Sequence, residues 1–315
     1  MNTVQEATHA LLWNRSSGWS DSDGIRHKLE SILSSRGARV EVKQVERGMN
    51  IQEESKAIVR SGANVLIAAG GDGTINAAAS ALIHQPAALG VIPAGTLNHF
   101  ARDLEIPLEP EKAAQVLLEG RINHVDAAAV NGRVFINNSV LGLFPNYRVA
   151  REAWERHGFG GTRVGRFVAT VAAVLKIFWR LPHLTVSLNI EGRRRTLRTP
   201  FVLVGNNEHR MEGLALGKRT RLDAGALWVY VMRPCSRWRL LPMILALITG
   251  RAPREDIFEV FRASHMTIDS KRRRIGVGID GEMVRMHAPL HYECLPGALQ
   301  VVVPASYPSL PEPAN

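Results

Sequence analysis

The chain has 315 residues, of which 45% are hydrophobic and 22% charged, a composition typical of a globular protein. It excludes disordered, collagen-like and coiled-coil chains, and two cysteines exclude a disulfide scaffold and fit a reducing compartment. The net charge of +10 is uneven, because residues 1–127 carry 12 basic and 15 acidic groups and residues 128–315 carry 27 and 14. The second part therefore either faces a polyanion, such as nucleic acid or an anionic membrane, or has a solvated arginine-rich surface.

The first part alternates between strands and helices. Apolar runs predict strands, and 3.6-residue periodicity predicts helices between them. Continuous apolar runs such as Val65–Ala69 and Leu89–Ile92 are typical of buried parallel strands. We therefore expect residues 1–127 to form an α/β domain with a doubly wound parallel sheet, with residues 296–306 as a candidate completion. The other expected elements are strands Ala10–Trp13 and Arg39–Val45 and helices Ile25–Ser35, Ile51–Ser61, Thr74–Ile83 and Glu111–Glu119.

The pattern changes near Asp126. Two apolar runs flank Asn131-Gly132, which predicts a β-hairpin. A helical stretch is expected at about Tyr147–Arg180. We expect residues 128–295 to form an antiparallel β-sandwich domain with inserted helices, and residues 307–315 to form a flexible tail. Further strands are predicted at Thr185–Ile190, Phe201–Val204, Leu227–Met232, Met266–Ile268, Arg274–Ile279, Met283–His287 and Leu299–Val303.

A glycine-rich turn, Gly70-Gly71-Asp72-Gly73-Thr74, follows one buried strand and opens a helix. Glycines let backbone N–H groups approach an anion, and a helix N-terminus adds partial positive charge. The turn matches neither the dinucleotide fingerprint nor a Walker A loop. A carboxylate in a phosphate-binding loop needs a cation, so Asp72 is a candidate for positioning Mg²⁺. The alternative is a tight turn capped by Asp and Thr.

A second polar loop follows the next buried strand. It contains Gly95, Thr96 and Asn98, in the run Pro93-Ala94-Gly95-Thr96-Leu97-Asn98-His99-Phe100-Ala101-Arg102. Hydroxyl and amide groups at a helix start can bond phosphate or ribose, and neighbouring strand ends would form one crevice. The alternative is ordinary capping of the following helix.

These two loops resemble those of the diacylglycerol kinase catalytic-domain family, which includes sphingosine and ceramide kinases and bacterial lipid kinases. The resemblance covers the whole chain, because further blocks follow in the family's order: Asn14–Gly18, Asp126, Asn137–Gly142, Val204–Asn207, Leu222–Gly225 and Ile279–Glu282. It implies a nucleotide-binding domain related to that of NAD kinase, a β-sandwich domain, and transfer of the γ-phosphoryl group of ATP to a lipid hydroxyl.

The resemblance also implies site residues. The nucleotide would be held by Asn14, Gly70, Gly71, Asp72, Gly73, Thr74, Asn76, Gly95, Thr96 and Asn98. Candidate Mg²⁺ ligands are Asp72, Asp126 and Asp223. Two departures are Arg15, where the family usually has proline, and Ala224, where many bacterial members have a second aspartate in a region that holds a structural Mg²⁺ in some members.

Asp280 is the candidate catalytic base, in the run Asp280-Gly281-Glu282 between two strands. A carboxylate can orient a hydroxyl and accept its proton, and a loose phosphoryl-transfer transition state needs little early proton removal. By resemblance Asp280 is the base, and Glu282 helps to hold the base or a metal. On local sequence alone, Asp-Gly favours a simple β-turn.

The sequence thus predicts an ATP- and Mg²⁺-dependent lipid kinase, with diacylglycerol as the expected substrate. No signal peptide and no apolar run of roughly 18 residues is visible, so we expect a cytoplasmic protein, peripheral on the inner face of an anionic membrane, with no nucleic-acid partner. A homodimer is one option. The alternatives are an NAD kinase-like enzyme and an inactive basic module that binds membranes or nucleic acid.

Overall fold

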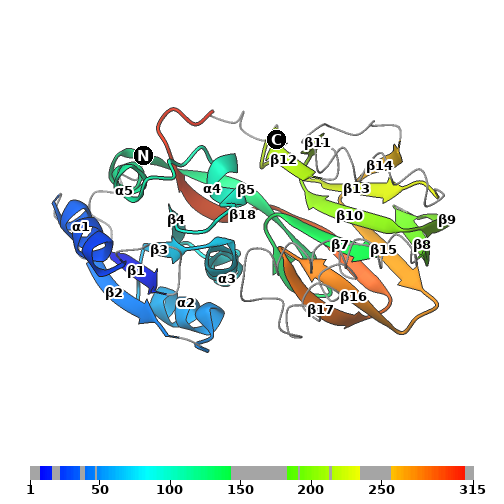
Figure 1. Cartoon of the computed structure of the whole chain (residues 1–315), viewed down its shortest axis with the longest axis horizontal. Helices are drawn as coiled ribbons and strands as arrows, with labels where there is room; N and C mark the ends of the chain where they lie inside the picture. The colour runs from blue at the N-terminus through cyan, green and yellow to red at the C-terminus, as the bar shows by residue number, and fades with distance from the viewer. Residues whose placement is uncertain are drawn as a thin grey trace, which may run out of the picture.

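Two parts lie side by side along the long axis in Figure 1: an α/β part with the N-terminus and a β-rich part. The structure is a computed structural model of the whole chain. It describes residues 8–15, 22–35, 40–46, 48–142, 183–190, 192–212, 215–234 and 257–308. Among these residues no helix is long and apolar enough to cross a bilayer.

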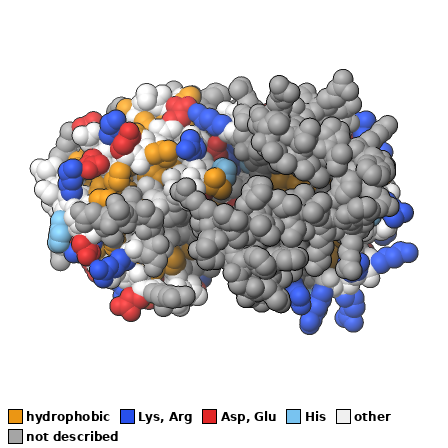
Figure 2. Space-filling view, in the orientation of Figure 1, with side chains coloured by type: hydrophobic (Ala, Val, Ile, Leu, Met, Phe, Trp, Pro, Cys, Tyr) orange, Lys and Arg blue, Asp and Glu red, His pale blue; other side chains and the backbone are white. Residues whose placement is uncertain are grey.

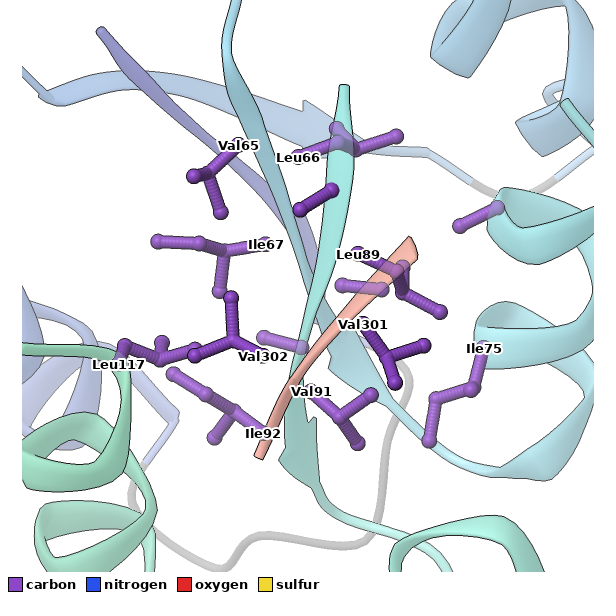
Figure 3. Packing of buried hydrophobic residues seen from close by; sticks show 14 of the residues in the cluster. Val65, Leu66, Ile67, Ile75, Leu89, Val91, Ile92, Leu117, Val301 and Val302 are labelled. Atoms are coloured by element: carbon purple, nitrogen blue, oxygen red, sulfur yellow. The ribbon is translucent and has the colours of Figure 1, made fainter. Parts of the chain in front are cut away.

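The first part is a parallel sheet, with strand order β2-β1-β3-β4, that helices cover on both faces. Its strands are β1 (His9–Asn14), β2 (Val40–Val45), β3 (Val65–Gly70) and β4 (Ala88–Pro93). Its helices are α1 (Ser22–Ser34), α2 (Ile51–Arg60), α3 (Asp72–Leu82), α4 (His99–Asp103) and α5 (Pro110–Glu119). Every residue of β3 and β4 is buried. Figure 3 shows why, since Leu117 of α5 and Ile75 of α3 lie on opposite sides of these strands.

Two long antiparallel strands, β5 (Arg121–Val130) and β18 (Leu290–Val303), run through both parts. At one end β18 pairs with β4 in parallel, and at the other it pairs with β15 (His265–Ser270). The residues Leu299 and Val301–Val303 belong to the first hydrophobic core, whereas Leu290 and Tyr292 belong to the second. The end of the chain therefore contributes a strand to the α/β sheet.

The second part is made of two antiparallel sheets that enclose the second core. One continues the large sheet through β15, β8 (Leu184–Ile190) and β9 (Arg193–Thr199). The other has the order β14-β13-β10-β7-β16-β17. Its strands are β7 (Asn138–Gly142), β10 (Phe201–Asn206), β13 (Leu227–Met232), β14 (Phe258–Ala263), β16 (Arg274–Ile279) and β17 (Glu282–His287). A short hairpin, β11 (His209–Glu212) and β12 (Ala215–Arg219), lies between β10 and β13 in the chain.

The predicted fold class is confirmed, as is the Asn131-Gly132 hairpin, which joins β5 to β6 (Arg133–Phe135). Both turn residues have positive φ, at 48° and 77°, as a tight two-residue hairpin turn requires. Tyr307, the first residue of the predicted tail, is buried, and its carbonyl accepts a 2.7 Å bond from Arg121 Nη2, whereas residues 309–315 lie outside the described residues. The final strand begins at Leu290 rather than Leu299. The predicted helix at 147–180 lies outside the described residues.

Candidate active site

Three polar loops meet at one edge of the parallel sheet. They follow β1, β3 and β4, which are neighbours, so their carboxyl ends share that edge. Asn14, at the end of β1, donates a 2.8 Å bond from Nδ2 to Oγ1 of Thr74 in the first turn of α3. Ala94, after β4, donates a 2.8 Å backbone bond to the carbonyl of Gly70. The structure thus brings together the predicted nucleotide residues of all three loops.

The close approach of the loop after β3 to the loop after β4 requires glycine. A Cβ atom on Gly95 would lie 2.9 Å from the Cα of Gly71 and 2.8 Å from Oδ1 of Asn98. A Cβ on Gly70 would lie 2.6 Å from the side chain of Thr74. Gly73 differs, because a Cβ there would meet no protein atom within 4 Å. The glycine at position 73 therefore faces open space at the start of α3.

Asp72 joins the glycine-rich turn to the loop after β4. Its Oδ2 accepts the backbone N–H of Asn98 at 3.0 Å, and its Oδ1 accepts that of His99 at 2.9 Å. Asn98 is in the left-handed region, with φ of 51°, and its side-chain amide bonds both the N–H and the carbonyl of Gly95 at 2.8 Å. These contacts fix the loop and leave Thr96 exposed beside it.

The first turn of α3 offers unpaired backbone donors. The backbone N–H groups of Thr74 and Ile75 bond the carbonyl of Gly71, whereas those of Asp72 and Gly73 donate to no group of the described residues. Free N–H groups at a helix N-terminus are suited to binding an anion. Asn76, one turn along, has a buried Oδ1 that accepts no hydrogen bond from the part of the chain that the structure describes.

Asp280 lies at the tip of the β16–β17 hairpin, with φ of 44°. Its carboxylate accepts three backbone N–H bonds, from Ile136 at 2.8 Å and from Asn137 and Asn138 at 2.9 Å. Burial raises the pKa of Asp280 to about 6, against the opposing effect of these three donors and of the Arg219 charge. The run Asp280-Gly281 is thus a hairpin turn, as local sequence suggested, and its carboxylate is also held in a fixed place.

The segment that holds Asp280 also packs against the α/β part. Ile136 belongs to the first core together with Ile75 of α3, and α3 contacts β6, which directly precedes Ile136. The segment that holds Asp280 therefore directly follows a strand that contacts the helix opened by the glycine-rich turn. Glu282 is placed differently, because 59% of its side chain is exposed and it pairs with Arg133 at 2.7 Å.

Asp126 and Asp223 lie at another junction. Asp126 is buried and accepts the backbone N–H groups of Gly225 at 2.7 Å and Gly297 at 2.9 Å; burial raises its pKa. Both oxygens of Asp223 are bonded by the guanidinium of Arg221, at 2.7 and 2.8 Å. Within the described residues, no group of three or more His, Cys, Asp or Glu side chains could hold a metal. Protein donors thus already contact both oxygens of each carboxylate, so neither Asp126 nor Asp223 depends on a metal ion for a partner.

Sequence reasoning missed Arg219 and Asp103, which form a buried ion pair between the two parts. Nε of Arg219 lies 2.7 Å from Oδ2 of Asp103, and the Arg219 backbone N–H donates to Oδ1 at 3.0 Å. No local signal marks either residue, since they are 116 positions apart.

Comparisons with known proteins agree with this arrangement. Residues 8–130 match the diacylglycerol kinase catalytic domain, and residues 162–303 match the YegS C-terminal NAD kinase beta sandwich-like domain. The "Probable lipid kinase YegS-like" of Pseudomonas aeruginosa is 30% identical over 84% of this chain and 83% of its own. The chain belongs to the diacylglycerol kinase catalytic-domain family. As a member of this family of lipid kinases, it is an enzyme.

Two further relatives match shorter parts of the chain, and one solved structure matches nearly all of it. A "Probable lipid kinase YegS-like" of Pectobacterium atrosepticum is 46% identical over 60% of this chain and 62% of its own. A diacylglycerol kinase of Staphylococcus carnosus is 35% identical over 44% and 43%. The crystal structure of a diacylglycerol kinase from Bacillus anthracis matches the fold with a TM-score of 0.72 at 21% identity, over 94% of this chain and 97% of that one.

Proposed function

We propose that this kinase transfers the γ-phosphoryl group of ATP to a lipid hydroxyl, with diacylglycerol as the first substrate to test. One observation carries the proposal: the three polar loops converge at one sheet edge, and β6, which directly precedes the segment that holds Asp280, contacts α3, the helix that the glycine-rich turn opens. The names of the relatives support the choice of lipid.

The loops would bind the triphosphate. The free backbone N–H groups of Asp72 and Gly73 and the exposed hydroxyl of Thr96 are donors for phosphate oxygens. Mg²⁺ would arrive as part of the ATP complex and neutralise phosphate charge. In our proposal Asp72 orders the loop after β4, because its two oxygens already accept N–H bonds.

Asp280 would act as the general base. In the transfer, the lipid oxygen forms a bond to the γ-phosphorus, the bond from that phosphorus to the β–γ bridging oxygen breaks, and ADP leaves. The hydroxyl proton passes to the Asp280 carboxylate, which is mostly ionised at neutral pH with a pKa of about 6. Glu282 lies exposed in its pair with Arg133 and has no chemical step in this proposal.

A cationic surface supports peripheral contact with anionic lipid. Lys271, Arg272 and Arg273, in the turn between β15 and β16, are exposed and form no ion pair with the described acidic residues. Figure 2 shows basic side chains along the outer rim of the β-rich part. Each such residue near an anionic surface contributes about 1 kcal/mol of attraction.

The direct test supplies labelled γ-phosphate to the purified protein with diacylglycerol, phosphatidylglycerol and a sphingoid base in mixed micelles, and in parallel with NAD. Labelled lipid is the expected product. Phosphorylation of NAD without a lipid product would instead make the protein an NAD kinase-like enzyme. Tight, salt-sensitive nucleic-acid binding without any ATP turnover would favour an inactive binding module.

A further inference from the structure

Among the described residues Arg219 is the one buried arginine, with 3% of its surface exposed. It ends β12, outside every motif that points to nucleotide or base. We infer that Arg219 is a positioning residue. It fixes the segment Ile136–Asn138, which holds Asp280, relative to α4, the helix that follows the loop after β4. The effect of Arg219 on catalysis rests on the proposed function, whereas its contacts with the segment are observed in the structure.

The first anchor of Arg219 is α4. Asp103, at the end of that helix, takes the Nε–H and the backbone N–H of Arg219. The guanidinium also lies over the ring of Phe100, with its carbon 5.8 Å from the ring centroid. Such a pair is held firmly because breaking one partner of a buried ion pair leaves an uncompensated charge.

The second anchor is the segment that holds Asp280. Nη1 of Arg219 donates to the carbonyls of Ile136 and, at 3.1 Å, of Asn206, and Nη2 donates to Oδ1 of Asn137 at 3.1 Å. The backbone N–H groups of Ile136 and Asn137 bond Asp280 at the same time. Arg219 therefore donates to the carbonyl of Ile136 and the side chain of Asn137, the same two residues whose backbone N–H groups bond Asp280.

A continuous series of contacts results. Asp72 in the glycine-rich turn bonds the start of α4, Asp103 at the end of α4 bonds Arg219, and Arg219 bonds the segment beneath Asp280. Because α4 has only five residues, little can bend between its two ends. The relative position of phosphate loop and base is thus set by a few short, charge-assisted bonds.

The fork of the guanidinium matters as well as its charge. Its donors reach four different acceptors in fixed directions, whereas a lysine ammonium has three donors at one point. The nearby titratable groups keep one state near neutral pH: burial lowers the pKa of His209 to about 3 and raises the pKa of Tyr307 to about 12. The charge of this cluster that acts on Asp280 is that of Arg219, which lowers the pKa of Asp280.

The experiment compares Arg219→Lys, Arg219→Gln and Asp103→Asn with the matched control Lys218→Gln. Lys218 is the neighbour of Arg219 on β12 and also pairs across the two parts, at 2.7 Å from Glu105, but it is exposed. Kinase assays give kcat, the KM for ATP and the pH profile, and circular dichroism checks that each variant is folded. Amide hydrogen exchange of residues 136–138 is measured without substrate.

For Arg219→Lys we expect kcat to fall about 10- to 100-fold with a near-constant KM for ATP, because the base is misplaced. For Arg219→Gln we expect the acid limb of the profile to move to higher pH as well, because a positive charge near Asp280 is lost. Exchange at residues 136–138 should accelerate about tenfold or more in both variants, and Lys218→Gln should match the wild type in every measurement.

A folded Arg219→Lys or Asp103→Asn variant with wild-type kcat, pH limb and exchange would overturn the inference. If Arg219→Lys does not fold, Asp103→Asn decides, since its amide keeps an acceptor and nearly the same shape. If the wild type phosphorylates no acceptor, the proposed function fails, and the exchange data still report whether Arg219 holds the segment.

Discussion

Oδ2 of Asp72 lies 3.0 Å from the backbone nitrogen of Asn98, a residue 26 positions further along the chain. This bond, with its companion to His99, ties the start of α3 to the start of α4. The acid inside the glycine-rich turn thus shapes the site by ordering a second loop. These two hydrogen bonds explain how a carboxylate is accommodated in a turn that is suited to binding phosphate.

Asp72→Asn should destabilise the protein and weaken ATP binding together. An amide presents one acceptor and one donor, so one of the two N–H groups would face another N–H and lose its bond. We expect the free energy of unfolding to fall by about 1–3 kcal/mol, measured by denaturant titration. Unchanged stability with a higher Mg²⁺ requirement would show instead that Asp72 acts on the metal.

Gly73→Ala and Gly95→Ala should separate a glycine needed by a ligand from one needed by the fold. A Cβ at 73 meets no protein atom, so stability should hold or rise by up to about 1 kcal/mol, as alanine favours a helix. ATP affinity should fall, because the methyl group enters the space assigned to phosphate. Gly95→Ala should lower both, since its Cβ collides with Gly71 and Asn98. Calorimetric titration measures the ATP affinity, and thermal unfolding measures the stability. ATP binding by Gly73→Ala as tight as that of the wild type would show that the phosphates do not bind beside Gly73.

The kcat/KM profile should show an acid limb near pH 6, since the base must be ionised and the pKa of Asp280 is raised to about 6. The same shift predicts a change in stability. Because the folded pKa lies above the usual value of 3.8, the folded state binds more protons, and the contribution of Asp280 to stability falls as pH rises from about 3.8 to about 6. The difference in unfolding free energy between wild type and Asp280→Asn should change in that window and be constant above it. A difference in unfolding free energy that does not change between about pH 3.8 and about pH 6 would contradict the raised pKa of Asp280.

Removal of divalent cations should not change the unfolding temperature of the nucleotide-free protein. Asp126 is bonded by two glycine N–H groups and Asp223 by the guanidinium of Arg221, so both carboxylates have protein partners without a metal ion. Arg221→Gln should lower the midpoint, because Asp223 then faces Asp126 without a cationic partner. Thermal scans in EDTA and in MgCl₂ check both; a wild-type midpoint that drops in EDTA and recovers with Mg²⁺ would establish a resident ion.

Mutation of Glu282 should have little effect on catalysis. An exposed ion pair contributes at most about 1 kcal/mol, and the carboxylate of Glu282 bonds Arg133 rather than the residues around Asp280. Glu282→Gln should therefore retain kcat within about threefold in the lipid kinase assay. A loss as large as that caused by Asp280→Asn would restore Glu282 as a catalytic residue.

The elements that the sequence predicted well are those with local signals. The buried runs of β3 and β4, the glycine-rich turn and the Asn131-Gly132 hairpin each encode their shape within a few residues. Arg219 and Asp103 could not be found this way, because their partners lie 13 to 116 positions away and each residue type is ordinary in its strand or helix.

The most direct test of the account is the rate of labelled γ-phosphate transfer to lipid by Asp280→Asn, with ATP affinity measured on the same preparation. The amide keeps the shape of the side chain but cannot accept the hydroxyl proton. We predict a kcat about 10²- to 10⁴-fold below wild type with ATP affinity nearly unchanged. Transfer at the wild-type rate would contradict the central claim that this half-buried acid, held by Ile136–Asn138, activates the alcohol.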